Sequence, residues 1–189
     1  MLCTRNSSRN KEDKEYIAMK VIINGRFLIH RVTGVERYAR EILSELDKII
    51  EPESIEMAVP SEVEDVPTYK NIKVIKVGKL HNRLWEHLSF PWYVYKNKGV
   101  SLNLCNVAPL PAPGIVCIHD VKVKATPQYF SKKFLMWYDL LLGNATKRAR
   151  KIITVSEFSK SEIVKYFKVN PYLPSSTVRT SFDFRLMMR

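Results

Sequence analysis

Apolar positions along the chain alternate between short runs rich in β-branched residues and longer stretches with helical spacing. The short runs are typical of buried strands and cover residues 20–24, 55–59, 71–77, 101–106, 115–119 and 151–155. Helical spacing predicts helices over residues 35–50, 80–95, 131–150 and 159–167, with a break or kink expected at Pro91. Strands and helices that alternate in this way predict an α/β fold, in which a mostly parallel sheet carries helices on both faces.

The two ends of the chain lack this pattern. Residues 1–18 are polar, and a strand signal begins directly after Met19, so we expect a flexible extension with translation starting at Met19. Residues 169–189 show no sustained period, and we interpret them as an irregular tail that an out-of-frame sequence would explain. The sequence therefore predicts one domain, over residues 19–168.

Composition and charge narrow the classes of partner. Of the 189 residues, 46% are hydrophobic and 26% are charged, which is typical of a globular domain. The net charge of +12 favours anionic partners, namely nucleic acid, an acidic membrane surface or a phosphorylated small molecule. Residues 1–120 hold 17 basic and 15 acidic side chains and residues 121–189 hold 14 and 4, so the excess lies in the last third. Nucleic acid is not expected, because no known binding motif is present.

Cysteine usage and hydropathy indicate the compartment. Cys3, Cys105 and Cys117 are too few and too scattered for a disulfide framework or a zinc site, which favours reduced thiols and a cytoplasmic protein. The sequence shows no signal peptide and no run of roughly 18 apolar residues. We therefore expect any membrane contact to be peripheral, at the inner face of the membrane.

The loop before the first helix is a candidate phosphate site. Thr33 is placed to cap the helix, and Gly34 allows a ligand to approach the free amides at its N-terminus, which favour an anion. The loop is neither a dinucleotide-binding nor a P-loop motif. The alternative is that Gly34 only eases the turn from strand to helix.

Two further polar pairs follow predicted strands. His119 can hydrogen-bond a hydroxyl group or stabilise developing charge, and Asp120 can orient it or cap the next loop; the alternative is a purely structural histidine. Ser156 and Glu157 can receive an anion or a hydroxylated substrate, or form a plain helix N-cap. His81 and His87 lie off helical register with each other, and we predict no metal site.

The predicted helix over residues 131–150 ends in a cluster of cations. Its apolar positions precede four basic residues, Lys147, Arg148, Arg150 and Lys151. This pattern is typical of a helix on an anionic membrane surface. The alternative is a core helix whose terminal cations complement its dipole.

Several fragments of the chain occur in a characteristic order: NGRFL, TGVERYAREIL, HNRLWEHLSFP, IVCIHDV followed by TPQYFS, and KIITVSEFSKSEIVKYF. Over residues 19–168 the ordered set resembles the N-terminal half of the group 1 glycosyltransferases, the family 4 enzymes of GT-B fold that build bacterial polysaccharides. The resemblance implies a Rossmann-like domain, one half of a GT-B fold. It also implies retaining transfer of a sugar from a nucleotide sugar to a glycan or lipid-linked acceptor, without a metal or other cofactor.

The resemblance also implies roles for the candidate residues. In this family the N-terminal domain holds the acceptor and the C-terminal domain holds the donor. Gly34 would approach the donor pyrophosphate, with Glu36 and Arg37 nearby. His119 would face the transferred sugar, and Asp120 would support it.

Ser156 and Glu157 would, by the same resemblance, lie near the cleft wall, just before the interdomain connection. The family's donor-binding domain is absent from this sequence. We therefore expect a truncated or frameshifted product, or one complemented by a separate donor-domain chain, which is inactive alone. The alternatives are a non-enzymatic basic module that binds an anionic membrane surface, and a fragment without function.

Overall fold

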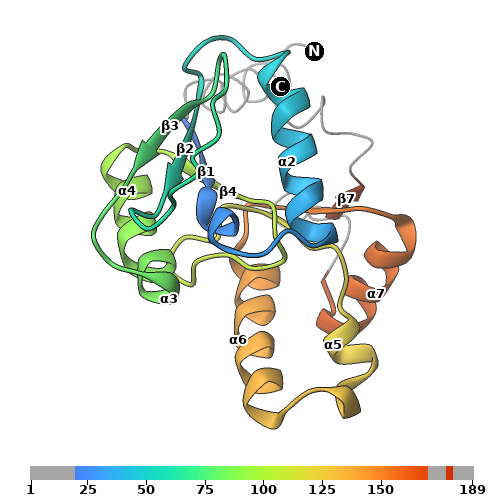
Figure 1. The fold of residues 1–189 in the computed structure, drawn as a ribbon. Helices are drawn as coiled ribbons and strands as arrows, with labels where there is room; N and C mark the ends of the chain where they lie inside the picture. Colours follow the sequence, from blue (N-terminus) through green and yellow to red (C-terminus); the bar gives the residue numbers. More distant parts are fainter. Residues whose placement is uncertain (1–19, 170–177, 181–189) are drawn as a thin grey trace, which may run out of the picture.

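The computed structural model describes residues 20–169 and 178–180 (Figure 1). Its strands form one sheet in the order β3-β2-β1-β4-β5-β6-β7, and every neighbouring pair is parallel. Their bounds are β1 Val21–Asn24, β2 Ile55–Val59, β3 Lys73–Lys76, β4 Val100–Asn103, β5 Ile115–Cys117, β6 Lys151–Thr154 and β7 Val178–Thr180. The predicted α/β class and its parallel sheet are confirmed.

Helices connect the strands and cover the sheet. The α-helices are α2 Gly34–Asp47, α3 Asn82–Leu84, α4 Phe90–Lys96, α5 Lys122–Ala125, α6 Lys132–Arg148 and α7 Glu157–Phe167. Two 3₁₀ turns, η1 Gly25–Ile29 and η3 Pro127–Tyr129, and one π-helical turn, η2 Trp85–Ser89, complete the elements between β1 and α7.

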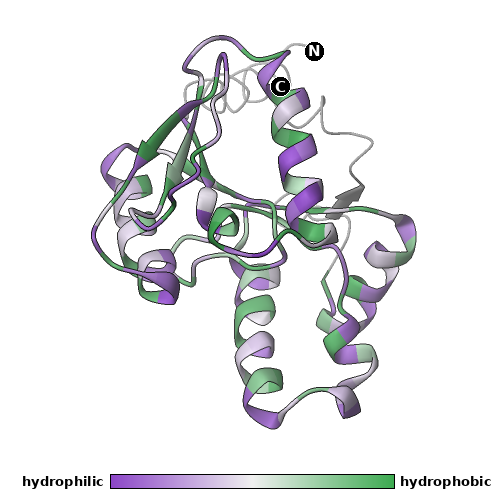
Figure 2. Ribbon diagram, in the orientation of Figure 1, coloured by the Kyte–Doolittle hydropathy of each residue, from purple (hydrophilic) through white to green (hydrophobic). Residues whose placement is uncertain are grey.

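The core lies on both faces of the sheet, because successive residues of a strand point in opposite directions. Ile23 of β1 packs in a cluster with Leu43 of α2, whereas the neighbouring Ile22 packs with Trp85 and Phe90. Figure 2 shows apolar and hydrophilic positions alternating along α2, as a helix with one buried face requires. Each large side chain buried in this way contributes about 1.5–3 kcal/mol.

A third cluster covers the other half of the sheet. Val116 of β5 and Ile152 of β6 pack there against Leu142 of α6 and Ile163 of α7. The predicted arrangement of helices on both faces is thereby confirmed. Because the helices cover the faces, a ligand site is expected at the carboxyl ends of the strands and in the loops that follow them.

The helical segment is not broken at Pro91, and its irregularity is a π-helical turn just before the proline. The backbone N–H of Phe90 donates to the carbonyl of Trp85, five residues earlier, and Pro91 lies in the first turn of α4. Proline is tolerated there because the first N–H groups of a helix have no partner within it. The chain therefore passes from α3 through η2 into α4 without leaving helical geometry.

The tail contributes an element that the sequence did not predict. Val178–Thr180 forms β7 and pairs in parallel with β6. Met19, the extension over residues 1–18 and the rest of the tail beyond residue 169 lie outside the described residues. The domain boundaries and the start at Met19 therefore stay predictions. Among the helices of the described residues, none is long and apolar enough to cross a bilayer.

Candidate functional site

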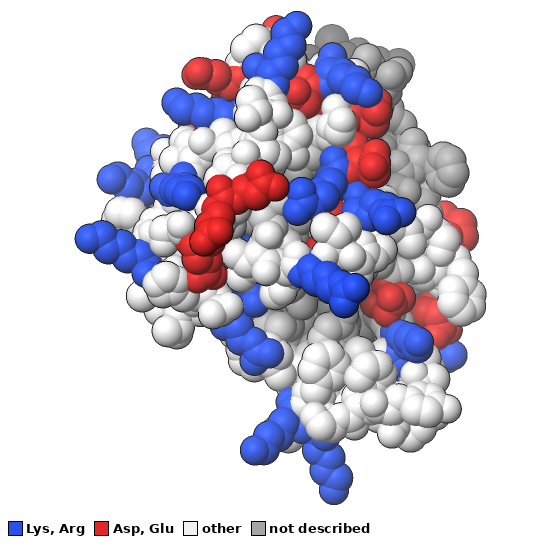
Figure 3. Space-filling view, viewed as in Figure 1, with Lys and Arg blue, Asp and Glu red and all other residues white. Residues whose placement is uncertain are grey.

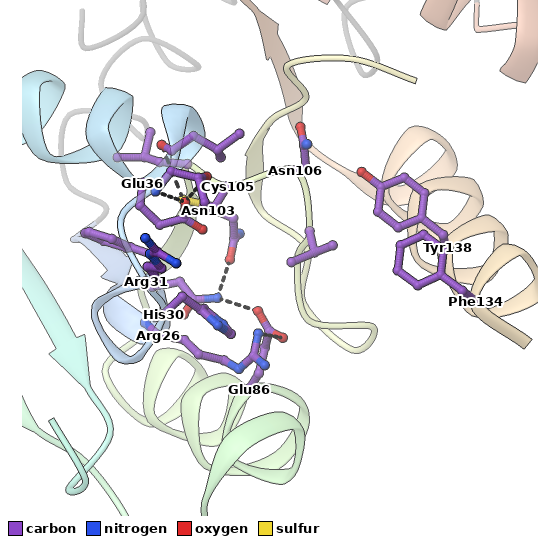
Figure 4. Close-up of a pocket in the computed structure, with 16 residues that line it drawn as sticks. Arg26, His30, Arg31, Glu36, Glu86, Asn103, Cys105, Asn106, Phe134 and Tyr138 are labelled. Atoms are coloured by element: carbon purple, nitrogen blue, oxygen red, sulfur yellow. Dashed lines mark hydrogen bonds and ion pairs between the residues drawn. The ribbon is translucent and has the colours of Figure 1, made fainter. Parts of the chain in front are cut away.

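A cleft of about 520 Å³ opens at the carboxyl ends of β1 and β4 (Figure 4). Its walls come from the ends of β1 and β4, the chain from η1 to the start of α2, η2, the loop after β4, and α6. The lining residues are Asn24, Arg26, Phe27, His30, Arg31, Thr33, Val35, Glu36, Glu86, Asn103, Leu104, Cys105, Asn106, Val107, Phe134 and Tyr138. This position agrees with the ligand site expected of an open parallel sheet.

Buried polar side chains form the floor of the cleft. The amide nitrogen of Asn24 donates to Glu86 Oε1 at 3.1 Å and to Asn103 Oδ1 at 3.0 Å. The amide of Asn103 donates in turn to the carbonyl of Pro113 at 2.9 Å. Asn24, Asn103 and Glu86 are all buried. A buried network with satisfied groups is rigid, so the floor is a fixed surface for a ligand.

Glu86 is a site residue that the sequence analysis missed. Its Oε2 accepts from Arg26 Nη1 at 3.1 Å, and the two side chains are 5% and 14% exposed. Glu86 lies four residues before Phe90, on the buried side of the helical segment. The sequence did carry a signal for Glu86: the helical pattern places this carboxylate on the side that faces the core. An acidic side chain is rarely buried without a partner, so such a position suggests a site.

The start of α2 is held by a carboxylate. Glu36 accepts a hydrogen bond from the backbone N–H of Thr33 at 3.0 Å and another from the Thr33 hydroxyl. Partial burial would raise the pKa of Glu36, but the hydrogen bonds from Thr33 outweigh it and hold the pKa below its usual value. Glu36 and Thr33 line the cleft, whereas the exposed Arg37 is not among the lining residues.

Gly34 leaves open space at the first residue of α2. A Cβ atom added there would meet nothing within 4 Å, so packing does not require glycine at this position. The space fits the approach of a ligand to the helix N-terminus, although Gly34 itself is not among the lining residues.

His119 lies behind the cleft wall and is held on two sides. Its Nε2 donates to the carbonyl of Leu104 at 2.8 Å, and its backbone N–H donates to Asn106 Oδ1 at 2.6 Å. The ring meets Tyr38 edge to face, with centroids 4.7 Å apart. Burial lowers the pKa of His119 and outweighs the hydrogen bond to Leu104 and the charge of Asp120, which both favour the protonated ring. The ring is therefore neutral near pH 7, with its proton on Nε2.

Asp120 caps the next turn. Its Oδ1 accepts from the backbone N–H of Lys122 at 3.0 Å, at the start of α5. The carboxylate is exposed, and it acts on His119 through its charge, which raises the pKa of the ring. Of the two roles considered from the sequence, the structure therefore shows the cap.

Ser156 and Glu157 follow β6, as predicted, and cap α7. The Ser156 hydroxyl accepts from the backbone N–H of Ser159 at 3.1 Å, and Glu157 pairs with Lys160 at 3.3 Å. Neither residue is among those lining the 520 Å³ cleft. The structure thus shows the N-cap, and a role at an interdomain wall stays a prediction.

At the basic end of α6, the side chain of Arg148 and the backbone of Arg150 contact the proline-rich loop over residues 109–114. Arg148 Nη1 donates to the carbonyl of Leu110 at 3.2 Å, and the backbone N–H of Arg150 donates to Gly114 at 2.7 Å. The side chain of Lys147 is exposed, and Lys151 begins β6. This arrangement fits cations that complement the helix dipole and fix the proline-rich loop.

An aromatic wall on α6 faces the polar floor. The rings of Phe130, Phe134 and Tyr138 stack in sequence, with centroids 5.4 and 5.5 Å apart. Figure 4 shows Phe134 and Tyr138 across the cleft from Arg26 and Glu86. Burial and the charge of Asp120 raise the pKa of Tyr138 to about 12, so its hydroxyl stays protonated.

The described residues hold no group of three or more His, Cys, Asp or Glu side chains that could bind a metal ion. Cys105, beside the cleft, and Cys117 are free thiols, and burial raises the pKa of both. Neither is therefore an activated nucleophile.

Comparison with known proteins gives one distant relative to report. No family model matches the chain. The chain is 22% identical over 173 residues to the O-antigen chain mannosyltransferase B of Escherichia coli, and the match covers 79% of this chain and 44% of that protein. The chain thus spans less than half the length of this relative. The similarity supports a relationship to glycosyltransferases, while membership of family 4 and the GT-B fold stay predictions.

Proposed function

We propose that this chain is the acceptor-binding half of a retaining glycosyltransferase, which transfers a sugar from a nucleotide sugar to a hydroxyl of a glycan or lipid-linked acceptor. The observation that carries the proposal is the cleft, where an aromatic wall faces a buried polar floor at the carboxyl ends of parallel strands. The distant similarity to an O-antigen chain mannosyltransferase supports the same class and suggests an oligosaccharide acceptor.

The cleft suits a sugar because sugars have two kinds of surface. The C–H face of a pyranose ring stacks on aromatic rings, which Phe134 and Tyr138 provide. Its hydroxyl groups need fixed hydrogen-bonding partners, and on the floor the Glu86 carboxylate, held by Asn24 and Arg26, keeps further lone pairs for them. In the proposal the acceptor lies between these two surfaces.

The donor side is proposed at the start of α2. The pyrophosphate would approach the backbone at Gly34, where open space adjoins the helix N-terminus. Arg31, which lines the cleft, and Arg37 on the first turn of α2 would offset its charge. Glu36 accepts the hydrogen bonds of Thr33, so its role is to keep the loop in shape.

His119 is proposed to face the transferred sugar from outside the 520 Å³ cleft, since it is not among the residues that line that cleft. Its Nε2 donates to Leu104, so Nδ1 is the ring nitrogen that remains for a sugar hydroxyl. A neutral imidazole can accept a hydrogen bond there, and Asp120 would stabilise a positive charge on the ring. No metal is invoked in the proposal.

The proposed transfer requires a second domain, because reacting groups of both substrates must converge on one anomeric carbon. We therefore propose that the 189 residues alone give little transfer. The rival, a non-enzymatic basic module, gains no support from α6, whose terminal Arg148 binds the Leu110 carbonyl.

A binding experiment tests the proposed acceptor site. Wild-type protein and the variants Tyr138→Ala and Tyr129→Ala are titrated by calorimetry with a panel of oligosaccharides, mannose-containing ones among them. Tyr129 is an exposed aromatic on η3 outside the cleft, and it is the matched control. We expect about a tenfold loss of affinity for Tyr138→Ala, since a stacked aromatic contributes on the order of 1–3 kcal/mol, and no change for Tyr129→Ala. Equal affinities for all three proteins would contradict the site.

A further inference from the structure

The helical segment from α3 to α4 carries an exposed apolar row on its outer face. Three of its members, Leu84, Trp92 and Tyr95, are 61%, 61% and 84% exposed. We name the row the outer stripe, and its residues are Leu80, Leu84, Leu88, Trp92 and Tyr95. Leu84, Leu88, Trp92 and Tyr95 recur every three or four positions and therefore lie on successive turns of one side, and Leu80 precedes the first turn.

The outer stripe is distinct from the core side of the same segment. Trp85, Phe90 and Val94 face inward and pack with Ile22 of β1. In a regular α-helix, positions four residues apart drift by about 40° around the axis at each step. The wider π-helical turn between Leu84 and Phe90 opposes this drift, so it helps to keep the stripe on one side while Trp85 stays buried.

Cations outnumber carboxylates around the outer stripe. Between residues 76 and 98 the one acidic side chain is Glu86, which is buried and paired with Arg26. One carboxylate from outside this range, Glu62, contacts the start of the segment, where it accepts from the backbone N–H of Asn82 and pairs with His81. Lys96 Nζ lies over the Trp92 ring, 5.1 Å from its centroid. Figure 3 shows basic side chains projecting from this edge of the molecule. The exposed basic residues of the segment are Lys76, Lys79, Arg83, Lys96 and Lys98.

A groove adds apolar depth to this face. It has a volume of about 720 Å³ and runs between the stripe and the proline-rich loop. Leu88, Trp92 and Tyr95 line one side, and Pro111 and Ala112 line the other. An exposed apolar surface with a polar rim marks a place of interaction.

The positive charge of this face favours an anionic partner. Two copies of the chain that met through the outer stripe would bring like charges together, which disfavours a dimer. A bilayer with anionic headgroups offers apolar chains to Leu84, Trp92 and Tyr95 and phosphates to the lysines. We propose that the outer stripe is the membrane-contacting surface of this protein and that it binds anionic bilayers peripherally. The inference goes beyond the proposed transferase and does not depend on it.

Vesicle co-sedimentation of the full chain tests this inference. The vesicles contain phosphatidylcholine alone or phosphatidylcholine with phosphatidylglycerol. Wild-type protein is expected to bind the anionic vesicles, and the double variant Trp92→Ser/Tyr95→Ser to bind them at least tenfold more weakly. The variant Lys96→Glu/Lys98→Glu should lose a similar factor, since each cation near the surface strengthens binding.

A matched control is provided by α6. Met136 and Leu140 are also exposed apolar side chains, and Met136→Ser/Leu140→Ser should bind as wild type. Circular dichroism checks that each variant is folded. We expect all of them to fold, because every substituted side chain is exposed. Wild-type binding by Trp92→Ser/Tyr95→Ser, equal binding to neutral vesicles, or loss of binding in the α6 control would each overturn the inference. So would a dimer in sedimentation equilibrium that the stripe variant abolishes.

Discussion

At the scale of single residues, the pair of Arg26 and Glu86 is the feature on which the cleft floor depends. The two side chains come from η1 and η2, 60 positions apart, and meet in a nearly dry environment. A buried ion pair adds little net stability, but removing one partner leaves an uncompensated charge. Glu86 is therefore expected to be important for folding as well as for the shape of the site.

Glu86→Gln is predicted to destabilise the protein by about 3–5 kcal/mol, because Arg26 then loses its counter-charge in a buried position. The amide oxygen of glutamine can still accept from Asn24, but its amide nitrogen then faces Arg26 Nη1, so the variant removes both the charge and the hydrogen bond to Arg26. Urea denaturation measures the effect. The double variant Arg26→Met/Glu86→Gln should recover part of the loss, and a Glu86→Gln change below about 0.5 kcal/mol would contradict this description of the pair.

Gly34→Ala is predicted to keep or raise stability, by up to about 1 kcal/mol, because alanine favours a helix and its methyl group meets open space. If the space serves a pyrophosphate, the same change should weaken the binding of inorganic pyrophosphate. Thermal unfolding and a pyrophosphate titration separate the two effects. A loss of stability would show that glycine serves the turn alone.

The sequence predicted some site residues and missed others for a definite physical reason. Residues that follow strands directly, such as His119 and Ser156, were found because a strand end is visible as the end of an apolar run. Glu86 and Tyr138 reach the cleft from helices whose placement depends on tertiary packing, so local patterns could not place them. The role of Asp120 as a cap likewise depends on where α5 begins.

At the scale of elements, a single carboxylate joins α2 to the strand that follows β2. Asp47 accepts hydrogen bonds from the backbone N–H groups of Lys70, Asn71 and Ile72 at 2.8, 2.7 and 2.9 Å. Burial raises the pKa of Asp47, but these three backbone bonds outweigh it and hold the pKa below its usual value. The end of α2 and the approach to β3 are thus fixed together.

Asp47→Asn is predicted to cost about 1.5–3 kcal/mol at pH 7, since its hydrogen bonds are charge-assisted. A lowered pKa means that this stability is present above the ordinary value near 4 and is lost as pH falls through the lower folded value. Stability measured by urea between pH 7 and pH 2 should therefore fall less steeply in the variant. Glu45→Gln, which removes an exposed pair with Lys48, is the control and should cost less than about 1 kcal/mol.

Elements with strong apolar periodicity were predictable. The strand over Ile55–Val59 and the helix that starts at Gly34 lie where the pattern placed them. Several short elements were not, and β7 and η2 show why. The short strand β7 takes its partner from β6, so pairing rather than local pattern defines it, and the π-helical turn η2 depends on Trp85 being held in the core, where its Nε1 donates to the Val77 carbonyl.

At the scale of the whole molecule, the domain presents two faces with different chemistry. The cleft at the carboxyl ends of β1 and β4 combines an aromatic wall with a polar floor, and the outer stripe on α3 to α4 combines apolar side chains with lysines. An acceptor carried on a lipid would be within reach of a protein held on the bilayer by its outer stripe. Part of the net charge of +12 then has a physical role, because five exposed cations lie on the segment that carries the stripe.

The central claim, that this chain is an acceptor-binding half, is tested most directly by titrating the purified wild-type protein with the oligosaccharide panel and with nucleotide sugars in one calorimetric series. The account predicts saturable binding of an oligosaccharide, at least tenfold tighter than any nucleotide sugar, and no turnover of the nucleotide sugars. Robust turnover of a nucleotide sugar by the 189-residue chain, or nucleotide-sugar binding without any oligosaccharide binding, would contradict it.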